Sequence, residues 1–215
     1  MSEVALRTVA GVLMILVALT AEWFGGTVFA VLVAAMATLV YYEWSRLVKG
    51  WGFGWHAAGF FYALIPALAL LWVRERAGQP VGDKGFALVI WAFIVTWATD
   101  IGAFFAGRTF GGPKLAPTIS PKKTISGMVG GVIAATLLAG IWAQATNLHW
   151  AWLLLAPLFS LTAVAGDLFE SWLKRKAGVK DSGAIIPGHG GVLDRLDGLV
   201  PVAVLTGAVV MAGLA

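Results

Sequence analysis

Two carboxylates, a hydroxyl and an ammonium group occur at helical spacing toward the C-terminal end of the sequence. Asp167, Glu170, Ser171 and Lys174 fall at positions i, i+3, i+4 and i+7. On a continuous helix these positions lie on one face, so the pattern predicts a polar stripe along that helix. For Glu170 and Lys174, an ordinary i, i+4 ion pair is the simpler alternative.

A further pair of carboxylates, Asp194 and Asp197, lies three residues apart where the chain enters its last apolar segment. We expect this pair to share one face as well. Carboxylate oxygens from two helix ends suit Mg²⁺, which takes one or two carboxylates and fills its other positions with water and substrate phosphates. The glycines within residues 187–191 would let backbone N–H groups approach an anion closely. His189 among them is more typical of a structural loop histidine than of a catalyst.

Another polar group ends just before residue 125. Ser120, Lys122, Lys123 and Thr124 supply hydroxyl and ammonium donors, a combination suited to phosphate oxygens. Lysines beside a membrane span are also typical topology determinants or lipid-headgroup contacts, so both interpretations stay open here.

Asp100 stands inside an apolar segment, where a carboxylate is costly. We expect it to face a polar cavity or a cation, and pairing with Arg108 or a lysine is the alternative. Gly127 and Gly131 form a small-xxx-small pair, which is typical of close helix packing.

The composition excludes a water-soluble globule. Of the 215 residues, 60% are hydrophobic and 12% are charged, against about 25% charged in an ordinary soluble domain. No cysteine is present, which excludes disulfides and thiolate ligands, and the three scattered histidines do not form a histidine metal cluster. The net charge of +4 is typical of membrane topology rather than of nucleic-acid binding, and we expect no nucleic-acid partner.

Apolar segments long enough to cross a membrane, about 20 residues as a helix, predict an all-α polytopic membrane protein with about seven spans. With a cytoplasmic N-terminus, all but three of the 15 Lys and Arg residues fall on the inner side, together with the polar loops 108–124 and 174–197. We expect one membrane domain over 1–215, with N-terminal helices in 1–84 and a catalytic part in 85–215. The predicted spans are 8–25, 27–44, 56–73, 85–107, 125–145, 150–173 and 198–214.

Residues 171–197 resemble, without a gap, the signature of the phosphatidate cytidylyltransferases, also called CDP-diacylglycerol synthases. A pattern of this length is far more specific than a single short motif. The resemblance covers roughly residues 90–200 in detail. Blocks that are similar to the family also occur at 97–104, 107–108, 114–117, 120–124 and 166–171.

Two features depart from the family pattern. Ser126 stands where many members have Glu or Gln, so we expect no catalytic role at that position. A length of 215 residues is short for the family, which predicts fewer N-terminal helices than the larger members have.

The resemblance implies transfer of a cytidylyl group from CTP to phosphatidic acid, which gives CDP-diacylglycerol and pyrophosphate. It implies Mg²⁺ held by Asp167, Asp194 and Asp197, with Asp181 as an alternative further ligand, and it leaves open a second, monovalent cation and a homodimer. Lys174 and Arg195 join the three aspartates as expected catalytic residues. The expected substrate-binding residues are Ser120, Lys122, Lys123, Thr124, Ser171, Arg175, Lys180, Asp181, His189, Gly190 and Gly191.

The expected location is a bacterial inner membrane, surrounded by membrane lipids, with the active site facing the cytoplasm. Two alternatives stay open at this point. A CTP-dependent enzyme could act on another lipid phosphate or on a polyprenol, and a small transporter or channel would also contain intramembrane carboxylates and basic loops.

Overall fold

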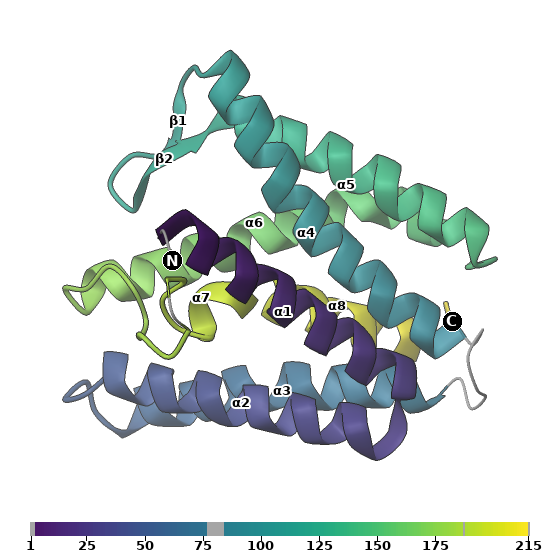
Figure 1. The fold of residues 1–215 in the computed structure, drawn as a ribbon, viewed down its shortest axis with the longest axis horizontal. Helices are drawn as coiled ribbons and strands as arrows, with labels where there is room; N and C mark the ends of the chain where they lie inside the picture. Colours follow the sequence, from purple (N-terminus) through teal and green to yellow (C-terminus); the bar gives the residue numbers. More distant parts are fainter. Residues whose placement is uncertain (1–2, 77–83, 187, 215) are drawn as a thin grey trace.

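A computed structural model of the chain describes residues 3–76, 84–186 and 188–214 (Figure 1). Pro187, part of the signature segment, and residues 77–83, between the predicted spans 56–73 and 85–107, lie outside the described residues. The long helices run lengthwise through the bundle, and a small β-hairpin projects from one end. The elements are α1 (Glu3–Phe24), α2 (Gly26–Leu47), α3 (Phe53–Arg76), α4 (Lys84–Phe110), β1 (Lys114–Ala116), β2 (Ser120–Thr124), α5 (Ile125–Ala145), α6 (Ala151–Lys176), α7 (Leu193–Leu196) and α8 (Leu199–Met211).

The prediction of an all-α membrane protein is confirmed. In the described part of the chain, six helices are long and apolar enough to cross a membrane, α1 to α6. The seventh predicted span, 198–214, is the shorter α8 of 13 residues, about 20 Å at the rise of an α-helix. It still runs from the end of the bundle that holds α7 toward the end where the described chain terminates (Figure 1).

The core of the bundle is formed around α4, whose side chains from Ala87 to Phe93 are all buried or nearly so. The Trp91 ring contacts the rings of Trp152 and Phe159 edge-on, with 4.9 Å between centroids in each pair. Such edge-to-face contacts stabilise beyond the area that they bury. The central position of α4 therefore fixes α6, which carries the predicted polar stripe.

Helices α4 and α5 pack closely because small residues line their contact. A Cβ at Gly131 would lie 2.6 Å from the Thr99 carbonyl oxygen, and one at Gly127 would lie 2.9 Å from that of Ala103. The predicted packing role of the Gly127 and Gly131 pair is confirmed, since any larger side chain would separate the helices.

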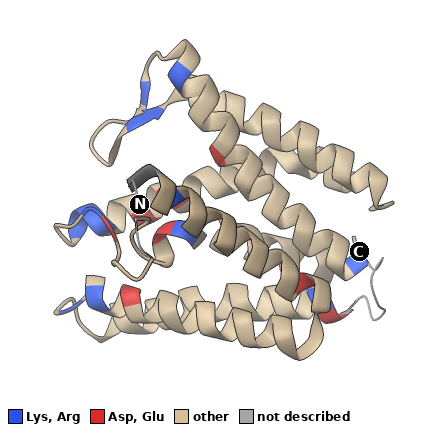
Figure 2. Ribbon diagram, viewed as in Figure 1, with Lys and Arg blue, Asp and Glu red and all other residues tan. Residues whose placement is uncertain are grey.

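Polar segments gather at one end of the bundle. The β-hairpin and the segment after α6 lie at the same end, as Figure 1 shows, and Lys and Arg are concentrated there in Figure 2. The described parts of loops 108–124 and 174–197 thus lie at one end of the bundle, in agreement with their expected placement on the same side of the membrane. The hairpin itself was expected only as a loop. At the opposite end, Arg74 Nε lies 2.8 Å from Glu22 Oε1 in a buried ion pair.

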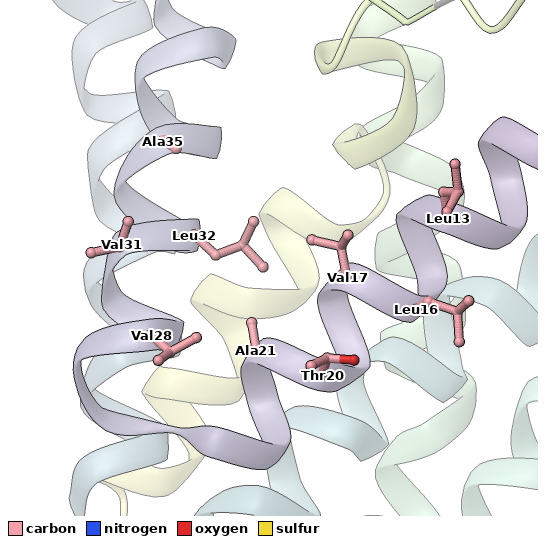
Figure 3. A pocket seen from close by; sticks show the side chains of 9 residues that line it. All are labelled: Leu13, Leu16, Val17, Thr20, Ala21, Val28, Val31, Leu32 and Ala35. Carbon is pink, nitrogen blue, oxygen red and sulfur yellow. The ribbon is translucent and has the colours of Figure 1, made fainter.

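An apolar groove of about 470 Å³ lies between α1 and α2 (Figure 3). None of the described residues that line it is titratable, so they offer no groups for acid–base or phosphate chemistry. Its lining is Leu13, Leu16, Val17, Thr20, Ala21, Val28, Val31, Leu32 and Ala35.

Candidate active site

The polar stripe on α6 is confirmed. Helix α6 continues unbroken to Lys176, so Asp167, Glu170, Ser171 and Lys174 share the predicted face. The Ser171 hydroxyl donates to Asp167 Oδ1 at 3.3 Å, and Lys174 Nζ lies 2.5 Å from Glu170 Oε2. Each carboxylate of the stripe therefore contacts a polar side chain of the same stripe, Asp167 the Ser171 hydroxyl and Glu170 the Lys174 ammonium.

Three carboxylates converge at the centre of the site. One oxygen each from Asp167, Glu170 and Asp197 lies within 4.8 Å of the others. Glu170 is 1% exposed, and its Oε1 accepts no hydrogen bond among the described residues. Like charges this close repel each other strongly unless a cation or a proton lies between them.

The repulsion between these carboxylates affects the pKa of Asp197, the residue that caps the C-terminal end of α7. Burial first, and then the negative charges of Asp167 and Asp100, raise the pKa of Asp197 to about 8. The Gly198 amide donates to Asp197 Oδ1 at 2.7 Å and partly offsets these effects. Asp100, on α4, therefore belongs to the electrostatic surroundings of this group, as does Lys123.

The β-hairpin brings one lysine to the acids. Lys123 forms an ion pair with Asp167, whereas its neighbour Lys122 is exposed, since adjacent residues of a strand point to opposite faces. Thr124 caps α5 and accepts the Gly127 amide at 3.0 Å. The sequence treated the two lysines as equivalent, and only strand formation separates them.

Asp194 is held by many donors. Lys174 Nζ lies 2.6 Å from its Oδ1, while Oδ2 receives the amides of Gly191 at 2.8 Å and Ser182 at 3.0 Å. The Ser182 hydroxyl also lies 3.0 Å from Oδ2. Burial by itself raises the pKa of Asp194, but the bonds from Lys174 and Gly191 outweigh it and hold the pKa below its ordinary value.

Asp194 and Asp197 both approach Glu170, as their expected common face implies. Asp197 joins the group of three carboxylates, whereas Asp194 shares Lys174 with Glu170. Asp194 stays a predicted metal ligand, although in this structure both of its oxygens are engaged by protein donors.

The remaining predicted residues lie around this centre. Arg175 donates from Nε to the Ile119 carbonyl at 3.3 Å, which ties the end of α6 to the hairpin. Arg195 is exposed, and its charge acts on Asp100. Among the described residues, the hydrogen bonds that orient Asp194 come from Lys174, Ser182 and Gly191, and Arg195 is not one of these donors. Ser120, Lys180 and Asp181 lie in the polar segments at this end.

The glycine loop folds back on itself through an isolated bridge between Ile186 and Gly190. Gly190 has φ of +82°, a backbone conformation that favours glycine, and the Gly191 amide is used by Asp194. His189 packs toward α1, with Nε2 at 3.7 Å from the place that a Cβ would take at Gly11. The structural reading of this histidine is thus supported by contact with α1.

Two buried contributors were missed from the sequence. Glu43, on α2, is 1% exposed and accepts hydrogen bonds from the segment before α7, and Ser182 links it to Asp194. A glutamate at the end of the predicted span 27–44 was the available signal, because a charge in an apolar segment needs a partner. Glu170, which the sequence placed in the polar stripe with an ordinary ion pair as the alternative, forms that pair with Lys174 and also belongs to the acidic group.

The acidic group suits a divalent cation. Around Mg²⁺, ligand oxygens lie at about 2.1 Å from the ion and so within about 3–4 Å of one another. One oxygen from each of the three carboxylates lies within 4.8 Å of the others, which is close to that requirement. Glu170 Oε1 is a buried acceptor without a hydrogen bond from the described residues, so it could bind a cation. The residues present therefore fit the ion that the chemistry implies.

Apolar helices long enough to span a membrane and a mixed acidic and cationic group at one end define a polytopic membrane protein. A sequence model of the cytidylyltransferase family matches residues 51–212. The chain therefore belongs to the cytidylyltransferase family.

Curated relatives carry a more specific name. A phosphatidate cytidylyltransferase of Brucella suis is 48% identical over 180 residues, 81% of this chain and 62% of the relative. That of Haemophilus influenzae is 46% identical over 148 residues, 65% of this chain and 51% of the relative. That of Helicobacter pylori is 46% identical over 120 residues, 55% of this chain and 45% of the relative. The chain thus spans less than two thirds of the length of these relatives.

Proposed function

We propose that this protein transfers a cytidylyl group from CTP to phosphatidic acid, forming CDP-diacylglycerol and pyrophosphate. The observation that carries the proposal is the convergence of Asp167, Glu170 and Asp197 beside Lys123 and Lys174 at one end of the bundle. Membership of the cytidylyltransferase family and the names of the relatives support this enzyme over a transporter or channel.

The reaction needs little proton chemistry. A phosphate oxygen of the lipid, already anionic near neutral pH, attacks the α-phosphorus of CTP. A new P–O bond forms, the bond from the α-phosphorus to the bridging oxygen breaks, and pyrophosphate leaves with the electron pair. The barrier is electrostatic, because one anion approaches another and charge builds up on the leaving group.

The chain's own residues address that barrier. Asp167, Glu170 and Asp197 would hold Mg²⁺, with Asp194 as a further ligand. The ion would supply positive charge that offsets repulsion between phosphates. Lys123, which pairs with Asp167, and the exposed Arg195, whose charge acts on Asp100, would bind phosphate oxygens, with the guanidinium able to do so through two parallel hydrogen bonds.

The location of the site suits one lipid substrate and one soluble substrate. The hairpin and the segment after α6 lie where the helices end (Figure 2). A lipid phosphate at the headgroup level and a nucleotide from the aqueous side can both reach such a place. We propose that this side is the cytoplasmic face of a bacterial inner membrane, in accord with the positive-inside rule.

Incubation of purified protein with labelled CTP and phosphatidic acid, followed by lipid chromatography, tests the proposal. We expect labelled CDP-diacylglycerol in the presence of Mg²⁺. The variants Asp167→Asn and Asp194→Asn should each lose about 100-fold or more in turnover while still folding in detergent, because each removes a charge from the site. If a polyprenyl phosphate is labelled and phosphatidic acid is not, the proposed lipid substrate is wrong. If no lipid is labelled, the proposed enzymatic activity is refuted.

Turnover close to that of the unchanged protein in either variant, at saturating Mg²⁺, would refute the role given to that aspartate. A binding measurement separates the two explanations for a loss. If CTP with Mg²⁺ still protects the Asp194→Asn variant against thermal unfolding, the loss lies in the chemical step.

A further inference from the structure

Glu43 is a buried carboxylate that the proposed chemistry does not use. It lies near the end of α2, upstream of the residues 51–212 that match the family, and is 1% exposed. A charged side chain in an apolar span is retained at a cost unless hydrogen bonds or a partner charge compensate it. Its partners should therefore reveal its role.

Among the described residues, all the hydrogen bonds that Glu43 accepts through its carboxylate come from one distant segment. Glu43 Oε1 accepts the Val192 amide at 3.0 Å, and Oε2 accepts the Leu193 amide at 2.8 Å. The Ser182 hydroxyl lies 2.9 Å from Oε2. A carboxylate that receives this many donors fixes the backbone carrying them, because each unmade bond would leave a buried polar group unsatisfied.

The same segment carries Asp194. The Ser182 hydroxyl lies between the two acids, 2.9 Å from Glu43 Oε2 and 3.0 Å from Asp194 Oδ2, and its one proton can be donated to either of them. Leu193, whose amide Glu43 accepts, directly precedes Asp194. Fixing that amide and that hydroxyl thus fixes the carboxylate which meets Lys174 at 2.6 Å.

The loop backbone is shaped for this contact. A Cβ at Gly183 would lie 2.6 Å from Glu43 Oε1, so a side chain at this position would displace the carboxylate. Trp44, beside Glu43, packs in one apolar cluster with Leu173, Val192 and Leu193. The cluster excludes water from the hydrogen bonds and strengthens them.

We propose that Glu43 is a positioning residue that holds residues 182–193 so that Asp194 meets Lys174. It thereby couples α2, which lies outside the matched family segment, to the site. The kinetic part of this inference rests on the proposed cytidylyl transfer. The structural part, that Glu43 orders the segment, stands without it.

Hydrogen–deuterium exchange and steady-state kinetics together test the inference on the full-length protein in detergent. In Glu43→Gln the size is kept, but an NH₂ group replaces an acceptor oxygen and faces amide donors. We expect peptides covering 182–194 to exchange at least tenfold faster, and kcat to fall about tenfold with the KM for CTP changed by less than about threefold. Glu43→Asp, which keeps the carboxylate, should recover part of both.

Glu22→Gln is the matched control. Glu22 is also fully buried, on α1, but pairs with Arg74 at the opposite end of the bundle. The control should lower the unfolding temperature, while leaving exchange in 182–194 unchanged and kcat within about twofold. A general loss of stability would affect both variants alike.

Each outcome decides the matter. Unchanged exchange in 182–194 for Glu43→Gln would overturn the positioning role, and so would faster exchange with an unchanged kcat. If Glu43→Gln does not fold, Ser182→Ala takes its place, because it removes the link to Asp194 while keeping the two backbone bonds. Its kcat should fall about threefold or more, and an unchanged kcat would overturn the inference. If the unchanged protein forms no CDP-lipid, the proposed function fails, while the exchange comparison still decides whether Glu43 orders the segment.

Discussion

Lys174 is shared by two nearly buried carboxylates, so its removal has a calculable consequence. Its Nζ lies 2.5 Å from Glu170 Oε2 and 2.6 Å from Asp194 Oδ1, and these side chains are 1% and 4% exposed. The variant Lys174→Met keeps a chain of similar length and removes the charge. Both carboxylates then lose the cation that they share.

The expected loss follows from the environment of each acid. Removing one partner of a buried ion pair costs about 3–5 kcal/mol. Asp194 keeps its donors from Ser182 and Gly191, so we expect the lower end of that range. At about 2–4 °C per kcal/mol for a chain of this size, the unfolding temperature should fall by about 6–12 °C.

A second substitution locates the cause. Glu170 Oε1 accepts no hydrogen bond among the described residues. Removal of the Lys174 ammonium should therefore destabilise Glu170 more than Asp194. Adding Glu170→Gln to Lys174→Met removes that uncompensated charge and should recover about half of the lost stability. Activity should not return, since neither the ammonium nor the Glu170 carboxylate is restored.

Thermal unfolding in detergent, followed by tryptophan fluorescence, measures both effects. Lys176→Met is the control on the same helix. Lys176 is exposed, and its ammonium lies 4.3, 4.6 and 5.1 Å from the ring centroids of Trp55, Trp51 and Trp172. Cation–π contacts at an exposed site are worth about 0.5–1 kcal/mol. A shift below about 2 °C for Lys174→Met, or a double variant less stable than the single one, would refute the reasoning.

Other predictions concern the cations, the metal and the topology. Arg195→Lys should lower kcat/KM for CTP about tenfold, or about 1.4 kcal/mol, because lysine cannot form the two parallel hydrogen bonds of a guanidinium. Lys49→Arg, in a predicted inner loop, should leave kcat/KM nearly unchanged, and equal tolerance of both changes would exclude the bidentate role of Arg195. Chelation of divalent ions should abolish CDP-diacylglycerol formation and added Mg²⁺ should restore it, and activity that survives chelation would remove the metal from the mechanism. Reporters inserted in 108–124 or 174–197 should behave as cytoplasmic and one fused after Ala215 as external; a cytoplasmic C-terminus would refute the predicted odd number of crossings.

The local pattern of the sequence was enough to predict much of this protein. Long apolar segments predict spanning helices because a lipid environment requires every backbone group to be bonded within the segment. Helical periodicity placed Asp167, Glu170, Ser171 and Lys174 on one face before any tertiary contact was known. The number of crossings between polar loops placed 108–124 and 174–197 at the same end. These are properties of the chain over short distances.

Contacts across long stretches of sequence were decided only by the tertiary structure. Glu43 and Leu193 are 150 positions apart, and no periodicity relates them. Their bond depends on how α2 packs against α6 and α7. Lys122 and Lys123 differ only because the hairpin turns one of them toward Asp167. Periodicity determines which face of an element a residue occupies, whereas packing determines what that face meets, and the partner sets the charge and hydrogen bonding at the site.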